Sequence, residues 1–474
     1  MSASGLIRAG ARMGCRGVPR FELSGEAWFA MTRALVGEAG LAFVALWADA
    51  GQVHALFHGG EAVVASVAVE AGLYAALSPA RPGAALFERM VADLWGHRAA
   101  DAVDVRPWLD HGVWPTLRPL SDRPVPNAAM GVEPEAPEML AGKGEAVGFG
   151  PLPPGLGAQS VAGPGYWVLH DVGLRVGRLE GRLGFGHRGV LGLMRGKSPA
   201  GAARIVARAD GAATVAHSVA FARAVEVVSE VVVPSRGAAL REVALAVERV
   251  AVELHRLDTV ASALERGWPA VQVAREGVLE ACGVAFGNRL MMDAVRPGGM
   301  VEVSGEGVAV LDAALAAVPG VERRWPAIGR LPIMEALRLG LGGVAGRASG
   351  RMDPADPAGE VLPGGDLAGR MGLLERAIGA DVAAARAGLA GLPGGEASVA
   401  LPIGSGEGMG VAMGPLGAVW HWVRLGGGTV TAAFAADPGW LLVPALERAA
   451  QGVEAGVLAA VVASFGYGVG GMDL

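Results

Sequence analysis

The spacing of apolar residues changes along this chain, and that change sets the class of fold. Residues 41–56 read as two strands around a turn at 49–52, and VVASVAV, starting at Val63, adds a third strand. A helix is expected over residues 84–95. Farther on, residues 236–258 carry apolar side chains at three-and-four spacing, which predicts a long helix with one buried face. The expected fold is therefore α+β.

The later part of the chain is expected to be mainly helical, with β-hairpins. In the helix over 236–258, the charged side chains of Glu242, Arg249, Glu253 and Arg256 fall on the face opposite the apolar stripe, where solvent is expected. Another stripe runs from Leu367 to Val382, after Gly365-Asp366. Residues 417–425 and 429–435 flank a Gly426-Gly427-Gly428 turn and predict a hairpin.

Loose, proline-bearing sequence separates these two regions. We expect a small α+β domain over residues 21–125, a linker over 126–150, and a mainly helical domain over 151–474.

Composition restricts the possible partners and cofactors. Lys plus Arg number 40 against 46 Asp plus Glu, and only 18% of residues are charged, so nucleic acid is not an expected partner. Cys15 and Cys282 are the two cysteines in 474 residues, too few for an iron–sulfur cluster or a cysteine zinc site. We expect no cofactor bound by this chain alone.

The two ends of the chain carry no expected membrane or export segment. Residues 1–20 contain four arginines and lack the uninterrupted apolar core of a signal peptide. The uncharged run over 455–472 contains five glycines, so a buried tail is expected there in preference to a membrane helix.

One segment, RADGAATVAHS at 208–218, resembles the segment that supplies the first cysteine pair to the metal centre of nickel–iron hydrogenase large subunits. Asp210 and Ala213 stand in the places of those cysteines. Further matches follow the order of that family, at residues 183–190 (LGFGHRGV), 296–299 (RPGG), 347–350 (RASG), 406–408 (GEG) and 420–425 (WHWVRL).

The N-terminal region also carries a match. Residues 88–96 resemble the E-R-E-x-x-D-x-x-G signature of the 30-kDa subunit of complex I, with Met90 at the second acidic position. The chain as a whole resembles a fusion of 30-kDa-like and 49-kDa-like modules, as in the large subunits of group 4 hydrogenases of the formate hydrogenlyase type.

The same resemblance places the second ligand pair at Gly468 and Gly471, so all four metal-ligand cysteines are missing. Nickel and iron held as in that family need soft thiolate ligands, so hydrogen activation by its mechanism is not expected. The family's tyrosine for quinone falls on Gly211, its cluster-adjacent histidine falls on Met291, and the hairpin over 150–157 lacks histidine.

The resemblance implies the large subunit of a complex I-like or group 4 hydrogenase-related complex. Electrons would pass from a small iron–sulfur partner subunit to a quinone-like acceptor, with antiporter-like membrane subunits as further partners. The location implied is cytoplasmic, peripheral to the inner membrane. NADH would be bound by another subunit, and no GxGxxG lies between a clear strand and helix here.

The candidate catalytic residues are Asp210, as a proton-handling group, and His187 with Arg188, near the partner's cluster. Alternative readings stay open for each: Asp210 as a helix cap, and His187 with Arg188 as a helix-start pair. For His217, a hydrogen-bonded core histidine is expected. The chain could also be a scaffold or coupling subunit without redox chemistry, so whether it is an enzyme stays open.

Overall fold

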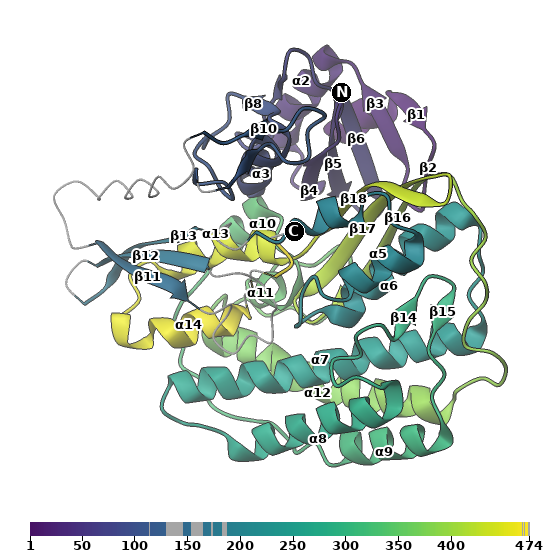
Figure 1. The fold of residues 1–474 in the computed structure, drawn as a ribbon. Coiled ribbons are helices and arrows are strands. Elements are labelled where there is room, and N and C mark those ends of the chain that lie inside the picture. Colours follow the sequence, from purple (N-terminus) through teal and green to yellow (C-terminus); the bar gives the residue numbers. More distant parts are fainter. Residues whose placement is uncertain are drawn as a thin grey trace.

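The computed structural model describes residues 1–112, 114–128, 146–152, 165–171, 174–182, 187–466, 468 and 470–472. The residues outside these ranges include 129–145, which make up most of the predicted linker. The α+β class predicted from the sequence is confirmed by a small N-terminal sheet region followed by a helical region with hairpins (Figure 1).

A five-stranded sheet forms the N-terminal region, in the order β1-β3-β6-β5-β4. Its strands are β1 (Ala11–Met13), β3 (Arg20–Leu23), β4 (Ala42–Ala48), β5 (Gln52–His58) and β6 (Ala62–Ala68). The strands β4, β5 and β6 are the three predicted ones and run antiparallel. Asp49 makes their first turn, because its Oδ1 accepts from the backbone N–H groups of Gly51 and Gln52 at 3.0 and 2.9 Å.

Short elements complete this region: α1 (Ala3–Arg8), β2 (Cys15–Arg16), α2 (Gly25–Ala34), β7 (Leu73–Ala75), α3 (Ala85–Trp95), β8 (Arg98–Ala100), β9 (Thr116–Leu117) and β10 (Val125–Pro126). Helix α3 is the helix predicted over 84–95. Its C-cap is Gly96, whose φ of 79° favours glycine.

The signature residues of α3 organise neighbouring loops. Glu88 accepts from the backbone N–H groups of residues 77–78 at 2.6 and 3.0 Å. Arg89 donates to carbonyl oxygens and Asp93 accepts from N–H groups within residues 106–109. Burial raises the pKa of Asp93 to about 6. These contacts give the motif a structural role, since they tie the loop to the helix.

The second region begins with β11 (Ala146–Leu152), β12 (Gly165–Asp171), β13 (Val176–Arg182), α4 (Val190–Met194), α5 (Pro199–Val206), α6 (Thr214–Ser229), α7 (Ser235–Ala263), α8 (Pro269–Phe286), β14 (Val295–Arg296) and β15 (Gly299–Met300). It continues with α9 (Gly305–Ala316), α10 (Ile333–Leu339), α11 (Gly343–Ala348), α12 (Leu367–Ala390), β16 (Gly406–Gly414), β17 (Gly417–Gly426), β18 (Thr429–Ala436), α13 (Gly439–Ala450) and α14 (Leu458–Phe465). The N-cap of α12 is Asp366, as the predicted helix start requires, with its Oδ1 accepting from Gly369 N–H at 2.8 Å.

The hairpin predicted near the C-terminus is confirmed as β17 and β18, with positive φ at Gly427 and Gly428. Strand β16 pairs with β17 and lies directly on α6. A Cβ atom at Gly410 would lie 2.3 Å from the carbonyl oxygen of Ala220. Glycine is therefore required there for the sheet and α6 to approach this closely.

Helix α7 departs from the predicted polar face. Glu242 is exposed and Arg249 is half-buried, but Glu253 and Arg256 are 3% and 5% exposed. The reason is that α12 and α14 pack along α7, and the Arg256 guanidinium donates to the carbonyl oxygen of Ser464 in α14. The prediction of a solvent-facing position was wrong for these two side chains.

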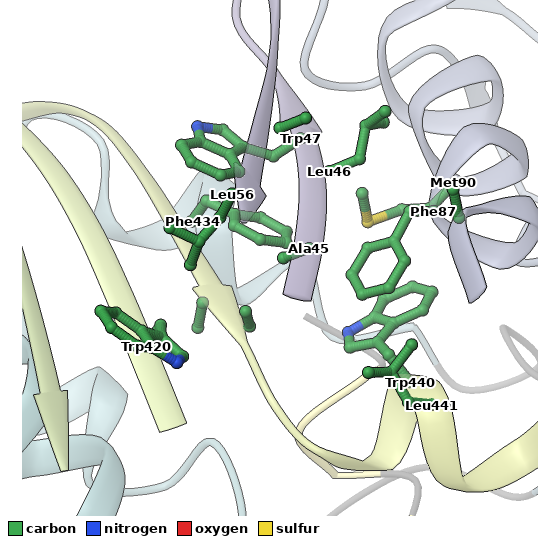
Figure 2. Close-up of a cluster of buried hydrophobic side chains, with 14 of the residues drawn as sticks. Ala45, Leu46, Trp47, Leu56, Phe87, Met90, Trp420, Phe434, Trp440 and Leu441 are labelled. Carbon is green, nitrogen blue, oxygen red and sulfur yellow. The ribbon is translucent and has the colours of Figure 1, made fainter. Parts of the chain in front are cut away.

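The two regions share one hydrophobic core (Figure 2). Trp47 of β4 stacks on Phe434 of β18 with ring centroids 5.3 Å apart, and Phe87 of α3 stacks on Trp440 of α13 at 4.7 Å. The strand β2 adds to the second region's sheet by pairing in parallel with β16. The N-terminal sheet therefore rests on β16–β18.

Ion pairs also join the two regions at this junction. Arg20 of β3 binds Glu407 of β16 at 3.1 Å, and Arg424 of β17 binds Asp49 at 2.7 Å and Glu407 at 2.9 Å. Glu407 and Arg424 belong to the GEG and WHWVRL segments, so these motif residues hold the two regions together.

In the parts of the chain that the structure describes, no helix has the length and apolar character to cross a bilayer. The buried tail predicted over 455–472 is confirmed in part: Phe465 and Met472 are inaccessible to solvent, whereas Ala455, Gly456 and Ala459 are exposed.

Candidate functional site

Asp210 lies in the loop between α5 and α6 and is 1% exposed. Its Oδ1 accepts from the Ala212 N–H at 2.7 Å, and its carbonyl oxygen accepts from the Thr214 hydroxyl at 3.1 Å. Burial, together with the negative charge of Asp437, raises the pKa of Asp210. This carboxyl group is therefore suited to hold a proton in the interior.

The cap of α6 comes from another residue. Glu248 of α7 accepts from the N–H groups of Val215 and Ala216 at 2.6 and 3.0 Å. Its complete burial raises its pKa to about 8, although both N–H groups favour the ionised form. Asp210 stabilises the turn that precedes α6. The N–H groups at the start of the helix are capped by Glu248 and not by Asp210.

A hydrogen-bonded row of side chains lies beside the start of α6. The Nδ1 of His217 is 3.0 Å from the Nε2 of His421, and the Nε2 of His217 is 3.1 Å from an oxygen of Asp437. All three side chains are buried, and burial holds the pKa of His421 well below its ordinary value. Asp437 also accepts from the Gly439 N–H at 2.6 Å. The prediction of a hydrogen-bonded core histidine at His217 is confirmed.

The positions that the sequence resemblance assigns to the four cysteine ligands lie beside these groups. A Cβ atom at Gly471 would lie 2.3 Å from the carboxyl carbon of Asp437, and one at Gly468 would lie 3.8 Å from Asp210 Oδ2. Ala213 is buried at the start of α6. The Asp437 carboxylate thus occupies the space that a side chain at Gly471 would need.

The residues present do not fit a nickel–iron pair. The positions that the resemblance assigns to metal ligands offer one carboxylate and no thiolate, and soft sulfur ligands select such metals. Among the described residues, no cluster of three or more His, Cys, Asp or Glu side chains is placed to hold a metal ion.

Arg188 ties the site to the C-terminal tail. Its guanidinium donates to the carbonyl oxygens of Arg208, Ala209 and Gly470 at 2.9, 2.8 and 2.9 Å. Its positive charge also lowers the pKa of Asp210 slightly against the effect of burial. The structure therefore places Arg188 beside the loop that carries Asp210.

His187 lies against another part of the chain. Its ring stacks on Trp114 with centroids 4.4 Å apart. The adjoining residues 183–186 of the predicted motif, and residues 153–157 of the predicted hairpin, lie outside the described residues. Met291, where the resemblance places the cluster-adjacent histidine, is buried with a φ of 57°.

Sequence reasoning missed Glu248, His421 and Asp437. A signal existed for Glu248, because this acid interrupts a run of apolar residues on α7. His421 lies between two tryptophans in a strand, and all three side chains are buried. Its partner His217 is 204 positions away, so no local pattern connects the two.

Comparison with known proteins adds a structural relative. No model of a known protein family matches the chain, and no curated protein matches its sequence. The fold is similar to a chain of the membrane-bound sulfane sulfur reductase, an archaeal respiratory membrane complex, with a TM-score of 0.62. The match covers 71% of this chain and 100% of the other at 20% sequence identity, which shows a shared fold.

Proposed function

We propose that this chain is the large subunit of a membrane-associated oxidoreductase complex, related to complex I and the group 4 hydrogenases but lacking a nickel–iron centre. Electrons would come from a small iron–sulfur partner subunit and reduce a quinone-like acceptor. The observation that carries the proposal is the buried set of Asp210, His217 and Asp437 where the resembling family binds its metals. The shared fold with a chain of a respiratory membrane complex supports it.

Proton supply is the chemistry that these residues fit best. Reducing a quinone to a quinol consumes two electrons and two protons. Asp210, whose pKa is raised by burial, would donate a proton to the acceptor oxygen. His217 can take a proton on one ring nitrogen and release one from the other, because its two nitrogens contact Asp437 and His421. Asp437, whose charge acts on Asp210, is the member of this row that we propose returns the proton to Asp210.

We propose supporting roles for the other two candidate residues, Arg188 and His187. Arg188 is proposed to position the loop that carries Asp210, since it binds the carbonyl oxygens of Arg208 and Ala209. We propose that His187 lies toward the cluster of the partner subunit. Antiporter-like membrane subunits complete the proposed complex, which would sit on the cytoplasmic side of the inner membrane.

The close packing of Asp437 against Gly471 supports a second candidate function. The Asp437 carboxylate fills that space, and the positions of the family's quinone-binding tyrosine and cluster-adjacent histidine are held by Gly211 and Met291. In this alternative, the chain is a coupling subunit without redox chemistry, and protonation of the buried site changes its contacts with the membrane arm.

The test is quinone reduction by the purified complex, measured with a short-chain quinone and the reduced iron–sulfur partner. Asp210→Asn should abolish the activity, and Asp210→Glu should restore part of it. Asp312→Asn, which removes an exposed ion pair with Arg386, is the matched control and should keep full activity.

Two results would decide against the redox proposal. Stoichiometric nickel in the active complex would contradict the loss of the metal centre. If the wild-type complex reduces no quinone, yet Asp210→Asn abolishes its ion translocation, the coupling function would be the correct one.

A further inference from the structure

A small cavity lies where the two regions of the fold meet. It measures about 60 Å³ and is lined from both sides. His58 of β5 comes from the N-terminal sheet, whereas Arg351 and Asp353, which follow α11, and Asp437, which follows β18, come from the second region. Trp420 and Leu441, visible in Figure 2, also line it.

Several side chains that line the cavity are polar and can bind water. Asp353 is 5% exposed, and its two oxygens accept from the N–H groups of Gly343 and Ala355 at 2.6 and 3.0 Å. Arg351 donates to the carbonyl oxygen of Leu341. The Nδ1 of His58 is buried and has no hydrogen-bond partner among the described residues. A nitrogen in this position requires a partner, which a water molecule in the cavity would provide.

The size of the cavity agrees with this requirement. A water molecule needs about 10–15 Å³ of such space and two to four polar partners, so a cavity of about 60 Å³ has room for several waters. Its wall extends from the half-buried His58 and Ala355 to the fully enclosed Asp437. The cavity therefore extends from near the surface to the hydrogen-bonded row of the candidate site.

We propose that this cavity holds a short chain of water molecules that carries protons between the surface near His58 and the Asp437–His217 pair. Each transfer is balanced: a water gives one proton to the carboxylate of Asp437 and receives one from the next water outward. The net result is one proton moved inward, and no electron is transferred. The use of these protons rests on the proposed function, but the path itself does not.

The charges around the path are suited to this task. Asp353 and Arg351 line the cavity with opposite charges, and the ring of His58 packs against that of Trp420 with centroids 6.1 Å apart. With Asp437, two carboxylates and one guanidinium line the cavity, so the lining favours a proton passing inward.

The experiment measures how fast the ring N–H of His217 exchanges with solvent in the full chain, by nuclear magnetic resonance with nitrogen-labelled histidine. The His217 signal is assigned by its loss in His217→Gln. Ala418→Leu and Ala355→Leu each add side-chain volume at a position that lines the cavity. Ala387→Leu, on an exposed face of α12, is the matched control.

We expect each filling variant that keeps the wild-type circular dichroism to slow exchange at least about tenfold, because local opening then becomes the remaining route. His58→Phe should slow it as well. The control should exchange like the wild type. Equal exchange in the filled and unfilled proteins would overturn the proposal, as would a high-resolution structure with a dry cavity. Neither result depends on an acceptor or partner, so the proposed function would be tested separately by quinone reduction.

Discussion

Replacement of Glu248 by glutamine gives a quantitative test of the buried site. Burial raises the pKa of this glutamate from its ordinary 4.5 to about 8 in the folded protein. Between these two values the folded chain keeps a proton that the unfolded chain releases. The free energy of unfolding therefore falls as pH rises from 4.5 to about 8, and Glu248 contributes no further slope beyond either limit.

The size of the effect follows from the two pKa values. At about 1.4 kcal/mol per pKa unit, the gap between 4.5 and about 8 corresponds to roughly 5 kcal/mol. Glutamine does not ionise, so Glu248→Gln removes this slope. Glutamine also offers one acceptor oxygen where glutamate offers two, which leaves the N–H of Val215 or Ala216 unpaired at a cost of about 1–3 kcal/mol.

The variant should therefore be less stable than the wild type by about 1–3 kcal/mol near pH 5 and more stable by about 2–4 kcal/mol above pH 8. Urea denaturation of the full chain, followed by circular dichroism at several pH values, measures the difference. Glu242→Gln is the control on the same helix, because Glu242 is exposed, and its difference from the wild type should stay small at every pH. Parallel pH profiles for Glu248→Gln and the wild type would refute the reasoning.

Three further substitutions test the packing and the ion pairs. Trp440→Ala should lower the free energy of unfolding, measured by urea denaturation, by about 3–5 kcal/mol. A loss below about 1 kcal/mol would contradict a core shared by the two regions. Gly471→Ala should lower the free energy of unfolding by about 1–3 kcal/mol, because the added methyl group collides with Asp437. Asp437→Ala in the same chain should remove this loss. If the losses of the two single variants simply add, the carboxylate of Asp437 does not fill the space beside Gly471. Glu407→Gln should lower the free energy of unfolding by about 3–5 kcal/mol because it removes the carboxylate that pairs with the buried Arg20 and with Arg424. A double-mutant cycle with Arg20→Met that shows no coupling would argue against the Arg20–Glu407 pair.

Local patterns in the sequence predicted the elements that depend on local interactions. The glycines at 427 and 428 adopt positive φ, so the hairpin of β17 and β18 was readable from the turn alone. The apolar stripe from Leu367 likewise predicted α12, and its start at Asp366 follows from side-chain capping.

The rest depends on contacts between distant positions. Glu253 and Arg256 have the spacing of a solvent-facing pair, and only the packing of α12 and α14 on α7 buries them. At the candidate site, Asp210 and Arg188 were identified through resemblance to a family. Glu248 and Asp437 were missed because they reach their partners across 33 and 220 positions of sequence.

The pairing of β2 with β16 has a consequence for biosynthesis. Cys15 is opposite Glu407, and Trp47 is covered by Phe434, so these contacts join residues that are far apart in the sequence. The N-terminal sheet therefore leaves the ribosome long before the strands that cover it are made. At about 5–20 residues per second, the interval between the completion of β5 and that of β18 is roughly 20–80 s. During this time the apolar face around Trp47 has no partner, which makes the nascent chain a client for chaperones that shield exposed hydrophobic surface.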